Sequence, residues 1–330
     1  MTDAPGEPSP RFAYARVERW SDLPPVDSRT IDVAVLDMNH GLPNVGHDAI
    51  VAIVRDAAVA LDAQLERGGL RIRAISYAVR HRLIVPRHDG RHRLYLGTGG
   101  PGHPDPRHNT EDNGEAGVRE DPSWEPPLWS LFDAIVSDER AALYGVCHTF
   151  GLLCRWSGIA EPKLRGADKG GKMSGVGTDE LTPQALDHPW FGALARDLPP
   201  PGRLPVLESR YYDLIPSASF PGRATPIAFE TRGEAHEHQR ALTMVEFARD
   251  GDVPRMFAVN NHPEIGAADR VGTLLDEMLA RGTITREVYE ARRAILPVLR
   301  DDRSAERLRV ARAVFSDLAR MQLERLSSAA

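Results

Sequence analysis

The sequence predicts an α/β fold built on a parallel sheet, because strand-like and helical patterns alternate along its first half. A β-branched run at 31–36 ends in a polar loop, and apolar residues then recur at helical spacing over 46–65. The alternation continues with strand-like runs at 71–77, 93–97 and 141–146 and a helical pattern at 128–137. Strand, loop and helix in this order form the repeating unit of a parallel sheet covered by helices.

The chain divides by composition into an arm, a main domain and a helical extension. Residues 1–29 carry five prolines and little periodicity, which predicts an arm laid over a domain whose ordered structure begins at 31. The main domain is expected over 30–268, and its later part holds shorter strand-like segments suited to hairpins and an outer sheet, at 204–214, 226–231, 242–248 and 256–259. Amphipathic stripes over 269–330 predict helices that pack on the core or on another subunit.

A long stretch almost without apolar residues interrupts the main domain. Between 97 and 127 the sequence is rich in glycine, proline, histidine and acidic residues. This length is unusual for a connection in a compact domain. We expect 102–127 to form either a lid or a disordered insert.

Composition and charge indicate an ordinary soluble globular protein. The 330 residues include 41 Lys and Arg against 47 Asp and Glu, a net charge of −6, with 42% hydrophobic and 27% charged residues. These values exclude disordered and fibrous classes, and the mild acidity argues against a general nucleic-acid surface. No stretch reaches the roughly 18 to 20 apolar residues of a membrane span, and the N-terminus lacks the order of a signal peptide. We expect a cytoplasmic protein whose partners are small molecules or proteins.

Cys147 follows an apolar strand-like run and precedes a helical pattern. This is the layout of a nucleophile elbow, in which a sharp strand-to-helix turn lifts a side chain above the sheet. The N-terminus of the following helix would favour the thiolate that a cysteine nucleophile needs at neutral pH. A buried structural cysteine would show the same pattern. The only other cysteine is Cys154, so a disulfide framework is excluded.

His262 and Glu264 follow the strand-like run at 256–259. A thiol nucleophile requires a base within hydrogen-bond reach, and that base requires an acceptor that orients it. His262 and Glu264 suit these two roles. Without a partner cysteine, a histidine after a strand would more often be a surface or capping residue.

A glycine-dense loop at 97–102 directly follows a strand-like run. Its backbone N–H groups are suited to a close approach to a developing oxyanion. The loop lacks the GxxxxGK[ST] pattern, so phosphate binding is the weaker interpretation. The alternative to an oxyanion loop is a flexible hinge for the insert.

Two further polar segments each allow two interpretations. The cluster at 208–213 combines Arg210 with Tyr211 and Tyr212, which suits the positioning of a substrate and is equally typical of cross-strand pairs. The polar side chains at 37–44 follow a strand at the sheet edge where ligands bind in α/β folds. They would either recognise a substrate or form a helix-capping turn.

Histidine-rich segments at 236–238 and 103–108 are the candidates for a metal site. Neither has the paired ligand spacing of a zinc site. We interpret both as solvated loop residues, and we expect neither a metal nor a cofactor.

Taken in order, these motifs resemble the class I glutamine amidotransferase-like superfamily over about residues 31–266. The motifs are GGPG at 99–102, the GVC elbow at 145–147, K-x-S-G-V at 172–176, SRYYD at 209–213 and HPE at 262–264. The resemblance implies a doubly wound, mostly parallel sheet of the flavodoxin-like type with helices on both faces. The predicted fold class is therefore this α/β sheet with a C-terminal helical extension.

The resemblance also implies a catalytic triad of Cys147, His262 and Glu264. Cys147 would attack a carbonyl to form a thioester, His262 would shuttle protons, and Glu264 would orient His262. The backbone N–H groups of Gly100 and His148 would form the oxyanion hole. The residues expected to contact the substrate are Gly99, Thr149, Ser209, Arg210, Tyr211 and Tyr212.

The sequence departs from the family pattern beside the elbow. Members that hydrolyse glutamine usually read G-x-C-x-G-x-Q, whereas this chain has Thr149 and Gly151 at the last two of these positions. Asn260 stands where a Gln is common, two residues before the histidine. We expect Thr149 to narrow the space above the thiol and His148 to add a second titratable group. These departures concern glutamine recognition and leave the acyl-enzyme machinery intact.

The predicted function is formation of a Cys147 thioester, followed by hydrolysis or transfer of the acyl group of glutamine or a glutamyl-like amide. A separate synthetase would accept released ammonia, and the helices after 269 would dock it or form a homodimer. One alternative is an acyl-CoA-dependent enzyme like the homoserine O-acyltransferases, which share the K-x-S-G-V and S-R-Y segments. A non-catalytic binding protein on the same fold is the other alternative.

Overall fold

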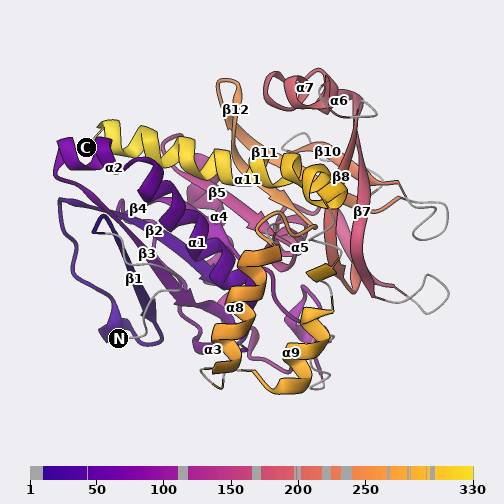
Figure 1. Cartoon of the computed structure of the whole chain (residues 1–330), viewed down its shortest axis with the longest axis horizontal. Helices are drawn as coiled ribbons and strands as arrows, with labels where there is room; N and C mark the ends of the chain where they lie inside the picture. The colour runs from indigo at the N-terminus through magenta and orange to yellow at the C-terminus, as the bar shows by residue number, and fades with distance from the viewer. Residues whose placement is uncertain are drawn as a thin grey trace.

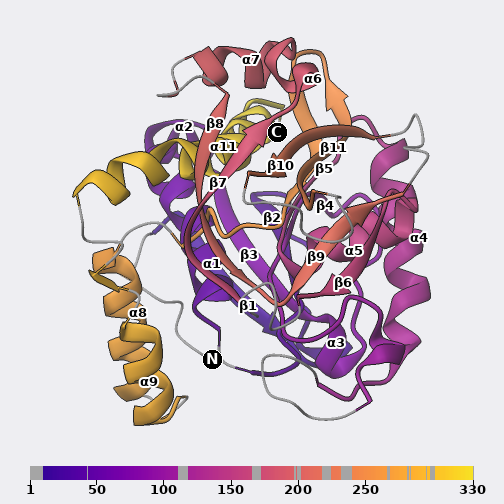
Figure 2. The same ribbon diagram turned by 90° about the vertical axis from the view of Figure 1, so that its right-hand side faces the viewer.

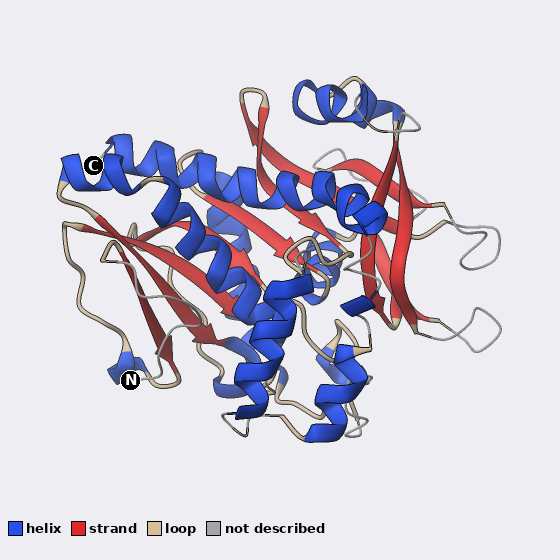
Figure 3. Cartoon of the chain, viewed as in Figure 1, coloured by secondary structure: helices blue, strands red, loops and turns tan. Residues whose placement is uncertain are grey.

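The computed structural model describes residues 10–42, 44–110, 118–165, 172–196, 198, 202–217, 224–231, 240–265, 268–280, 282, 284–294, 296–297 and 302–329. These residues form a twisted mixed sheet with helices on both faces (Figure 1, Figure 3). The strands lie in the order β1-β3-β2-β4-β5-β12-β11-β10-β7-β8, and β9 pairs with both β11 and β6. The predicted doubly wound α/β fold is confirmed.

The first part of the sheet is parallel. Five neighbouring strands run in one direction, namely β3 (Arg71–Ala78), β2 (Thr30–Asp37), β4 (His92–Gly97), β5 (Ala142–Val146) and β12 (Val253–Val259). Counted along the chain from β2, their order is 2-1-3-4-5, which is the flavodoxin-like order. The carboxyl ends of these strands therefore meet at one edge of the sheet.

The N-terminal segment is not only an arm. Phe12–Val17 forms β1, which pairs in parallel with β3 at the edge of the sheet. The expectation that ordered structure begins at 31 was wrong. The strand gives a weak apolar signal because it is an edge strand in which every side chain but that of Val17 is only partly buried. The short helix η1 (Trp20–Asp22) follows it.

An antiparallel extension completes the sheet beyond β12. Its strands are β11 (Leu242–Asp250), β10 (Thr225–Glu230), β7 (Met173–Leu181), β8 (Arg203–Arg210), β9 (Tyr212–Pro216) and β6 (Ala160–Leu164). The single strand-like segment predicted at 204–214 is two strands, β8 and β9, separated at Tyr211. The helices α6 (Pro183–Leu186) and α7 (Pro189–Arg196) connect β7 with β8.

Helices cover each face of the parallel strands and enclose a separate core there. Val33 and Val35 of β2 face a core with α1 (Val45–Ala60), α2 (Asp62–Gly68) and α11 (Asp302–Ala329). The alternating residues Ala34 and Leu36 face a second core with α3 (Val79–Arg82), α4 (Glu125–Ser137) and α5 (His148–Ser157). Figures 1 and 2 show α1 and α11 on the opposite face from α4. Successive side chains of β2 thus alternate between the two cores, as the side chains of a strand buried on both faces do.

The C-terminal helices divide between two environments. The apolar stripe of α11, including Phe315 and Leu318, is buried in the core shared with α1. The helices α8 (Ala268–Ala280) and α9 (Arg286–Arg293) lie beside the N-terminal end of α1 (Figure 2). They form a third apolar cluster with Val45 and Leu207. The boundaries at 29 and 268 stay predictions.

The described parts of the 102–127 segment are packed against the domain. They contain η2 (Pro106–His108), η4 (Pro122–Trp124) and the first turn of α4. Trp124 is fully buried, and Glu120 forms a buried ion pair with Arg80. Among the described helices, none combines the length and the apolar character needed to cross a membrane.

Candidate active site

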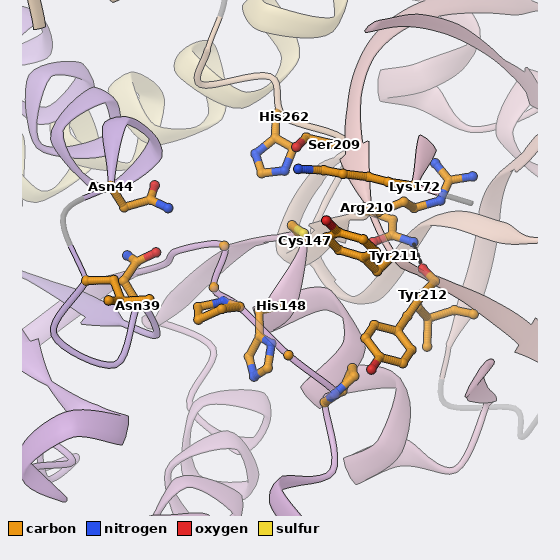
Figure 4. Close-up of a pocket in the computed structure, with 18 of the residues that line it drawn as sticks. Asn39, Asn44, Cys147, His148, Lys172, Ser209, Arg210, Tyr211, Tyr212 and His262 are labelled. Carbon is orange, nitrogen blue, oxygen red and sulfur yellow. Dashed lines mark hydrogen bonds between the residues drawn. The ribbon is translucent and has the colours of Figure 1, made fainter. Parts of the chain in front are cut away.

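A cavity of about 130 Å³ lies at the carboxyl ends of β4, β5 and β12, the edge at which open α/β sheets bind ligands (Figure 4). Residues from the glycine loop, the elbow, β8 and α9 surround it. Its lining includes Asn39, Asn44, Gly99, Gly100, Pro104, Cys147, His148, Lys172, Ser209, Arg210, Tyr211, Tyr212, Asn260, His262 and Arg292.

Cys147 occupies a strand-to-helix turn between β5 and α5. Its backbone has φ 48° and ψ −99°, a positive φ that is uncommon for a residue with a side chain. Its N–H donates a 2.7 Å hydrogen bond to the carbonyl oxygen of Val259, the last residue of β12. This bond and the start of α5 fix the strained turn, and the half-buried thiol faces the cavity (Figure 4).

His262 and Glu264 follow β12 and lie against Cys147. The Nδ1 atom of His262 is 2.8 Å from Oε1 of the buried Glu264. A Cβ atom placed on Gly99 would lie 3.2 Å from His262 Cε1 and 3.5 Å from Cys147 Cβ, so the glycine loop contacts both residues. Burial opposes protonation of His262, but the charges of Glu264 and Cys147 outweigh it and raise the pKa of the imidazole well above 6.5.

The N-terminus of α1 surrounds the Glu264 carboxylate. A Cβ atom on Gly46 would lie 2.9 Å from Glu264 Oε1, so a larger residue would displace the carboxylate. Asn44 caps this helix, because its Oδ1 accepts hydrogen bonds from the N–H groups of Gly46 and His47 at 2.7 and 3.3 Å. Asn44 also lines the cavity. The helix-capping interpretation of the 37–44 loop therefore holds for Asn44, and substrate recognition by this residue stays a prediction.

Arg80 links the glycine loop to the segment after β2. The guanidinium donates 2.8 Å hydrogen bonds to the carbonyl oxygens of Met38 and Pro101 and pairs with the Glu120 carboxylate. A Cβ atom on Gly100 would lie 2.2 Å from Met38 O, so only glycine fits there. Arg80 and Glu120 are structural contributors to the site that the sequence did not indicate, since their pairing joins distant segments.

His148 is the first residue of α5, so its N–H has no acceptor within the helix. Gly100 and His148 both line the cavity that contains Cys147, and their oxyanion role stays a prediction. The His148 ring is buried, and burial together with the Arg80 charge lowers its pKa well below 6.5. The second titratable group expected at the elbow is therefore neutral.

Thr149 does not contact the cavity, contrary to the expectation that it would bind the substrate and narrow the space above the thiol. It is fully buried, and its hydroxyl donates a 2.8 Å hydrogen bond to Thr98 O. Its methyl group packs against Gly97 and Gly145, where a Cβ atom would lie 2.4 and 2.7 Å from Thr149 Cγ2. Thr149 thus faces the sheet, because these two glycines leave room for it.

Gly151 lies under the first part of the insert. A Cβ atom at this position would lie 2.6 Å from Pro104 Cγ. Pro104 therefore fills the space in which the usual glutamine side chain of the family pattern would begin. Pro104 also lines the cavity.

The cluster at 208–213 has a divided role. Ser209, Tyr211 and Tyr212 line the cavity, and their contact with a substrate stays a prediction. Arg210 also reaches the lining, but it is buried and its guanidinium is paired with three carboxylates, Glu208, Asp213 and Glu230. These pairs fix the guanidinium at the β8–β9 junction, and the contact of Arg210 with a substrate stays a prediction.

Lys172 and Arg292 bring two positive charges to the cavity that the sequence analysis did not assign to it. The Lys172 Nζ atom lies 5.1 Å from the centre of the Tyr211 ring. Lys172 was visible in the K-x-S-G-V motif, whereas Arg292 is one charged residue among many on α9. Only the packing of α9 beside the site singles it out.

The histidine-rich segments do not supply a metal site within the described residues. The rings of His103 and His108 lie 4.6 Å apart, and His103 also contacts the Tyr212 ring. Among the described residues, no group of three or more His, Cys, Asp or Glu side chains is arranged to hold a metal ion. The segment 236–238 lies outside the described residues.

No protein-family model matches the chain, and no curated protein sequence matches it. Among solved structures, it is similar to a glutamine amidotransferase from Thermotoga maritima, with a TM-score of 0.48 and 16% identity over 90% of this chain and 98% of that chain. It is also similar to a glutamine amido transferase from Methylobacillus flagellatus, with a TM-score of 0.48 and 15% identity over 88% of this chain and 94% of that chain. Function therefore rests on the geometry of the site itself.

Proposed function

We propose that this chain is a class I glutamine amidotransferase-like enzyme that forms a thioester on Cys147 and hydrolyses or transfers the acyl group of glutamine or a glutamyl-like amide. The observation that carries the proposal is that Cys147 and His262 line one cavity, that Glu264 pairs with His262, and that the thiol stands in a strained elbow. A nucleophile, a base within reach and an acceptor that orients the base are the parts of a cysteine-dependent acyl-transfer site.

In the first step, Cys147 Sγ attacks the amide carbonyl carbon and an S–C bond forms. The carbonyl oxygen becomes an oxyanion beside the N–H groups of Gly100 and His148. The His262 imidazolium gives its Nε2 proton to the leaving nitrogen as the C–N bond breaks, so the amine departs neutral and the thioester remains. Glu264 holds Nδ1 and keeps Nε2 directed at the reacting atoms.

In the second step, water or an amine acceptor attacks the thioester carbon. The acceptor gives its proton to His262 Nε2 while its own bond to the acyl carbon forms, and the S–C bond breaks. Cys147 leaves as the thiolate beside the imidazolium, which is the starting ion pair. The raised pKa of His262 supports this state, because it favours the charged imidazole.

The charges at the cavity suit an acyl donor with a carboxylate of its own. Lys172 and Arg292 both line the space that contains Cys147. A glutamyl group carries a carboxylate several bonds away from its reactive amide, and cations bind carboxylates through charge-assisted hydrogen bonds. This is the basis for a glutamyl-like donor rather than an uncharged amide.

The test is intact-protein mass spectrometry after incubation with a glutamine-mimicking electrophile or, separately, with short acyl-CoAs. We expect the mimic to label the wild type and not Cys147→Ala. Cys154→Ala is the matched control and should still be labelled, because Cys154 is buried and its pKa is raised well above 9.0 by burial. A Cys147 adduct from acyl-CoA alone would favour the acyltransferase alternative, and no adduct from either reagent would favour a binding protein.

A further inference from the structure

A second cavity of about 380 Å³ adjoins the first on the side of α8 and α9. Aliphatic side chains form much of its lining, namely Val45, Leu207, Ile265, Val271 and Leu275. The first and second cavities share His262 and Ser209, together with the two cations Lys172 and Arg292. The rest of the lining is polar or charged apart from Gly46, and includes Asn44, Ser174 and Glu208. A cavity of about 150 Å³ with aliphatic walls is large enough for benzene, so by volume this space has room for a group at least that large.

The second cavity lies on the imidazole side of the reacting centre. His262 lines both cavities, whereas Cys147 lines only the first. In the mechanism above, His262 protonates the nitrogen that leaves, so the leaving group must lie next to the imidazole when the C–N bond breaks. The group attached to that nitrogen therefore extends toward the second cavity.

We propose that the second cavity binds the amine portion of the substrate, and that the preferred donors are N-alkyl or N-aryl glutamyl-type amides rather than glutamine. This inference rests on the proposed function. The C–N bond breaks as His262 supplies one proton, and a neutral alkyl- or arylamine is released into an apolar space. The carboxylate of Glu208 in the lining does not oppose this, because it is paired with Arg210.

Two observations on the acyl side agree with this assignment. The first cavity is small, and Pro104 fills the space next to Gly151 where the family pattern has its glutamine side chain. The larger volume lies where a primary amide would place only an NH₂ group. Apolar contact with an N-substituent therefore offers more binding free energy than glutamine can provide.

The experiment compares kcat/KM of the wild type for glutamine and for a series of γ-glutamyl n-alkylamides from methyl to butyl. We expect kcat/KM to rise about fourfold for each methylene, the factor that corresponds to about 0.8 kcal/mol per buried CH₂. A butylamide turned over no faster than glutamine would overturn the inference. The same amines should also capture the thioester in competition with water, with butylamine ahead of methylamine.

Variants of α8 locate the effect in the second cavity. Leu275→Phe and Val271→Phe each fill the space, and either should reduce the preference for butylamide over methylamide to less than about threefold. Leu279→Phe is the matched control, since Leu279 lies on the same helix outside the cavity lining, and it should keep the full preference. If Leu275→Phe or Val271→Phe folds and keeps the full preference for butylamide over methylamide, the amine subsite does not lie in the second cavity.

The inference and the proposed function fail in distinguishable ways. The glutamine-mimicking electrophile carries no N-alkyl group, so its reaction with Cys147 does not depend on the second cavity. If Cys147 is labelled but kcat/KM does not rise along the alkylamide series, the inference alone is contradicted. No labelling and no turnover of any amide would contradict the proposed function, and the inference with it.

Discussion

The ring of Pro104 packs directly on Gly151, leaving no space for a side chain on this turn of α5. The contact joins the insert to α5, the helix that begins directly after Cys147. It explains how the chain can differ from the pattern of the glutamine-hydrolysing proteins beside Cys147 while the elbow keeps its shape. At position 151 the chain has glycine where the pattern has glutamine, and the Pro104 ring occupies the space beside it. Restoring the glutamine tests this packing.

Gly151→Gln should destabilise the protein by about 1–3 kcal/mol, because the added Cβ lies 2.6 Å from Pro104 Cγ and the loop must move. Urea denaturation measures the change. Combining it with Pro104→Ala should recover part of the loss, since the clashing Cγ is removed. Equal stability of Gly151→Gln and the wild type would show that the loop adapts freely.

Gly145→Ala should be costly in the wild type and much less costly beside Thr149→Ser. The serine lacks the methyl group that would meet the new Cβ at 2.7 Å, and it keeps the hydroxyl that donates to Thr98 O. We expect a coupling free energy of about 1 kcal/mol in a double-mutant cycle of unfolding. Additive changes would contradict the packing described for Thr149.

Glu264→Gln should move the alkaline limb of the kcat/KM profile to lower pH. The carboxylate is one of the charges that raise the pKa of His262, so a neutral amide lowers that pKa and the imidazolium loses its proton earlier as pH rises. A stopped assay over pH 6 to about pH 10 locates the limb. Glu66→Gln on α2, far from the site, should leave the limb in place. If the alkaline limb of Glu264→Gln lies at the wild-type pH, Glu264 does not affect the titration that limits kcat/KM.

Asp179→Asn should remove a pH dependence of stability. Burial and the nearby Glu208 raise the pKa of Asp179 to about 8, whereas an unfolded aspartate titrates near about 3.9. Between these values the folded chain binds the additional proton, so wild-type stability falls as pH rises from about 4 to about 8. The variant keeps an acceptor for Asn261 and should be more stable than the wild type at pH 8 by about 1–3 kcal/mol.

Urea denaturation at pH 5 and at pH 8 makes this comparison. The advantage of Asp179→Asn should be small at the lower pH and should grow as pH increases. Asp252→Asn, in the exposed turn before β12, is the control and should show no such trend. An advantage that is the same at both values would mean that Asp179 is ionised in the folded protein throughout.

Lys172→Met should raise KM for a glutamyl donor about tenfold or more and change kcat by less than about threefold, because a lost charge-assisted contact is worth about 1.5–3 kcal/mol. Lys163→Met on β6 is the matched control and should behave as the wild type. A fall in kcat with an unchanged KM would assign Lys172 to the chemical step instead.

The parallel part of the fold could be predicted because its strands are continuous apolar runs buried on both faces. The edge strand β1 could not, since all but its last side chain are only partly buried and prolines stand on both sides of it. The break at Tyr211 was missed for another reason. Both β8 and β9 are strand-like, and only their different partners separate them, because β8 pairs with β7 whereas β9 pairs with β6 and β11.

The site could be predicted as far as its residues follow strands in sequence. Cys147 and His262 each come directly after such a run, and the order of motifs connected them. Gly46 and Leu275 could not be found this way, because each reaches the site through helix packing between distant segments. Thr149 was misplaced because the room beside it is made by two glycines on neighbouring strands.

The backbone bond from Cys147 N–H to Val259 O has a consequence for the protein during its synthesis. The ribosome completes the elbow residue long before it completes β12, so a nascent chain carries the thiol without the strand that fixes the turn. His262 and Glu264 are translated later still. We therefore expect unfinished or truncated chains to carry an ordinary cysteine, and the reactive thiol to mark only chains whose two neighbouring strands have paired.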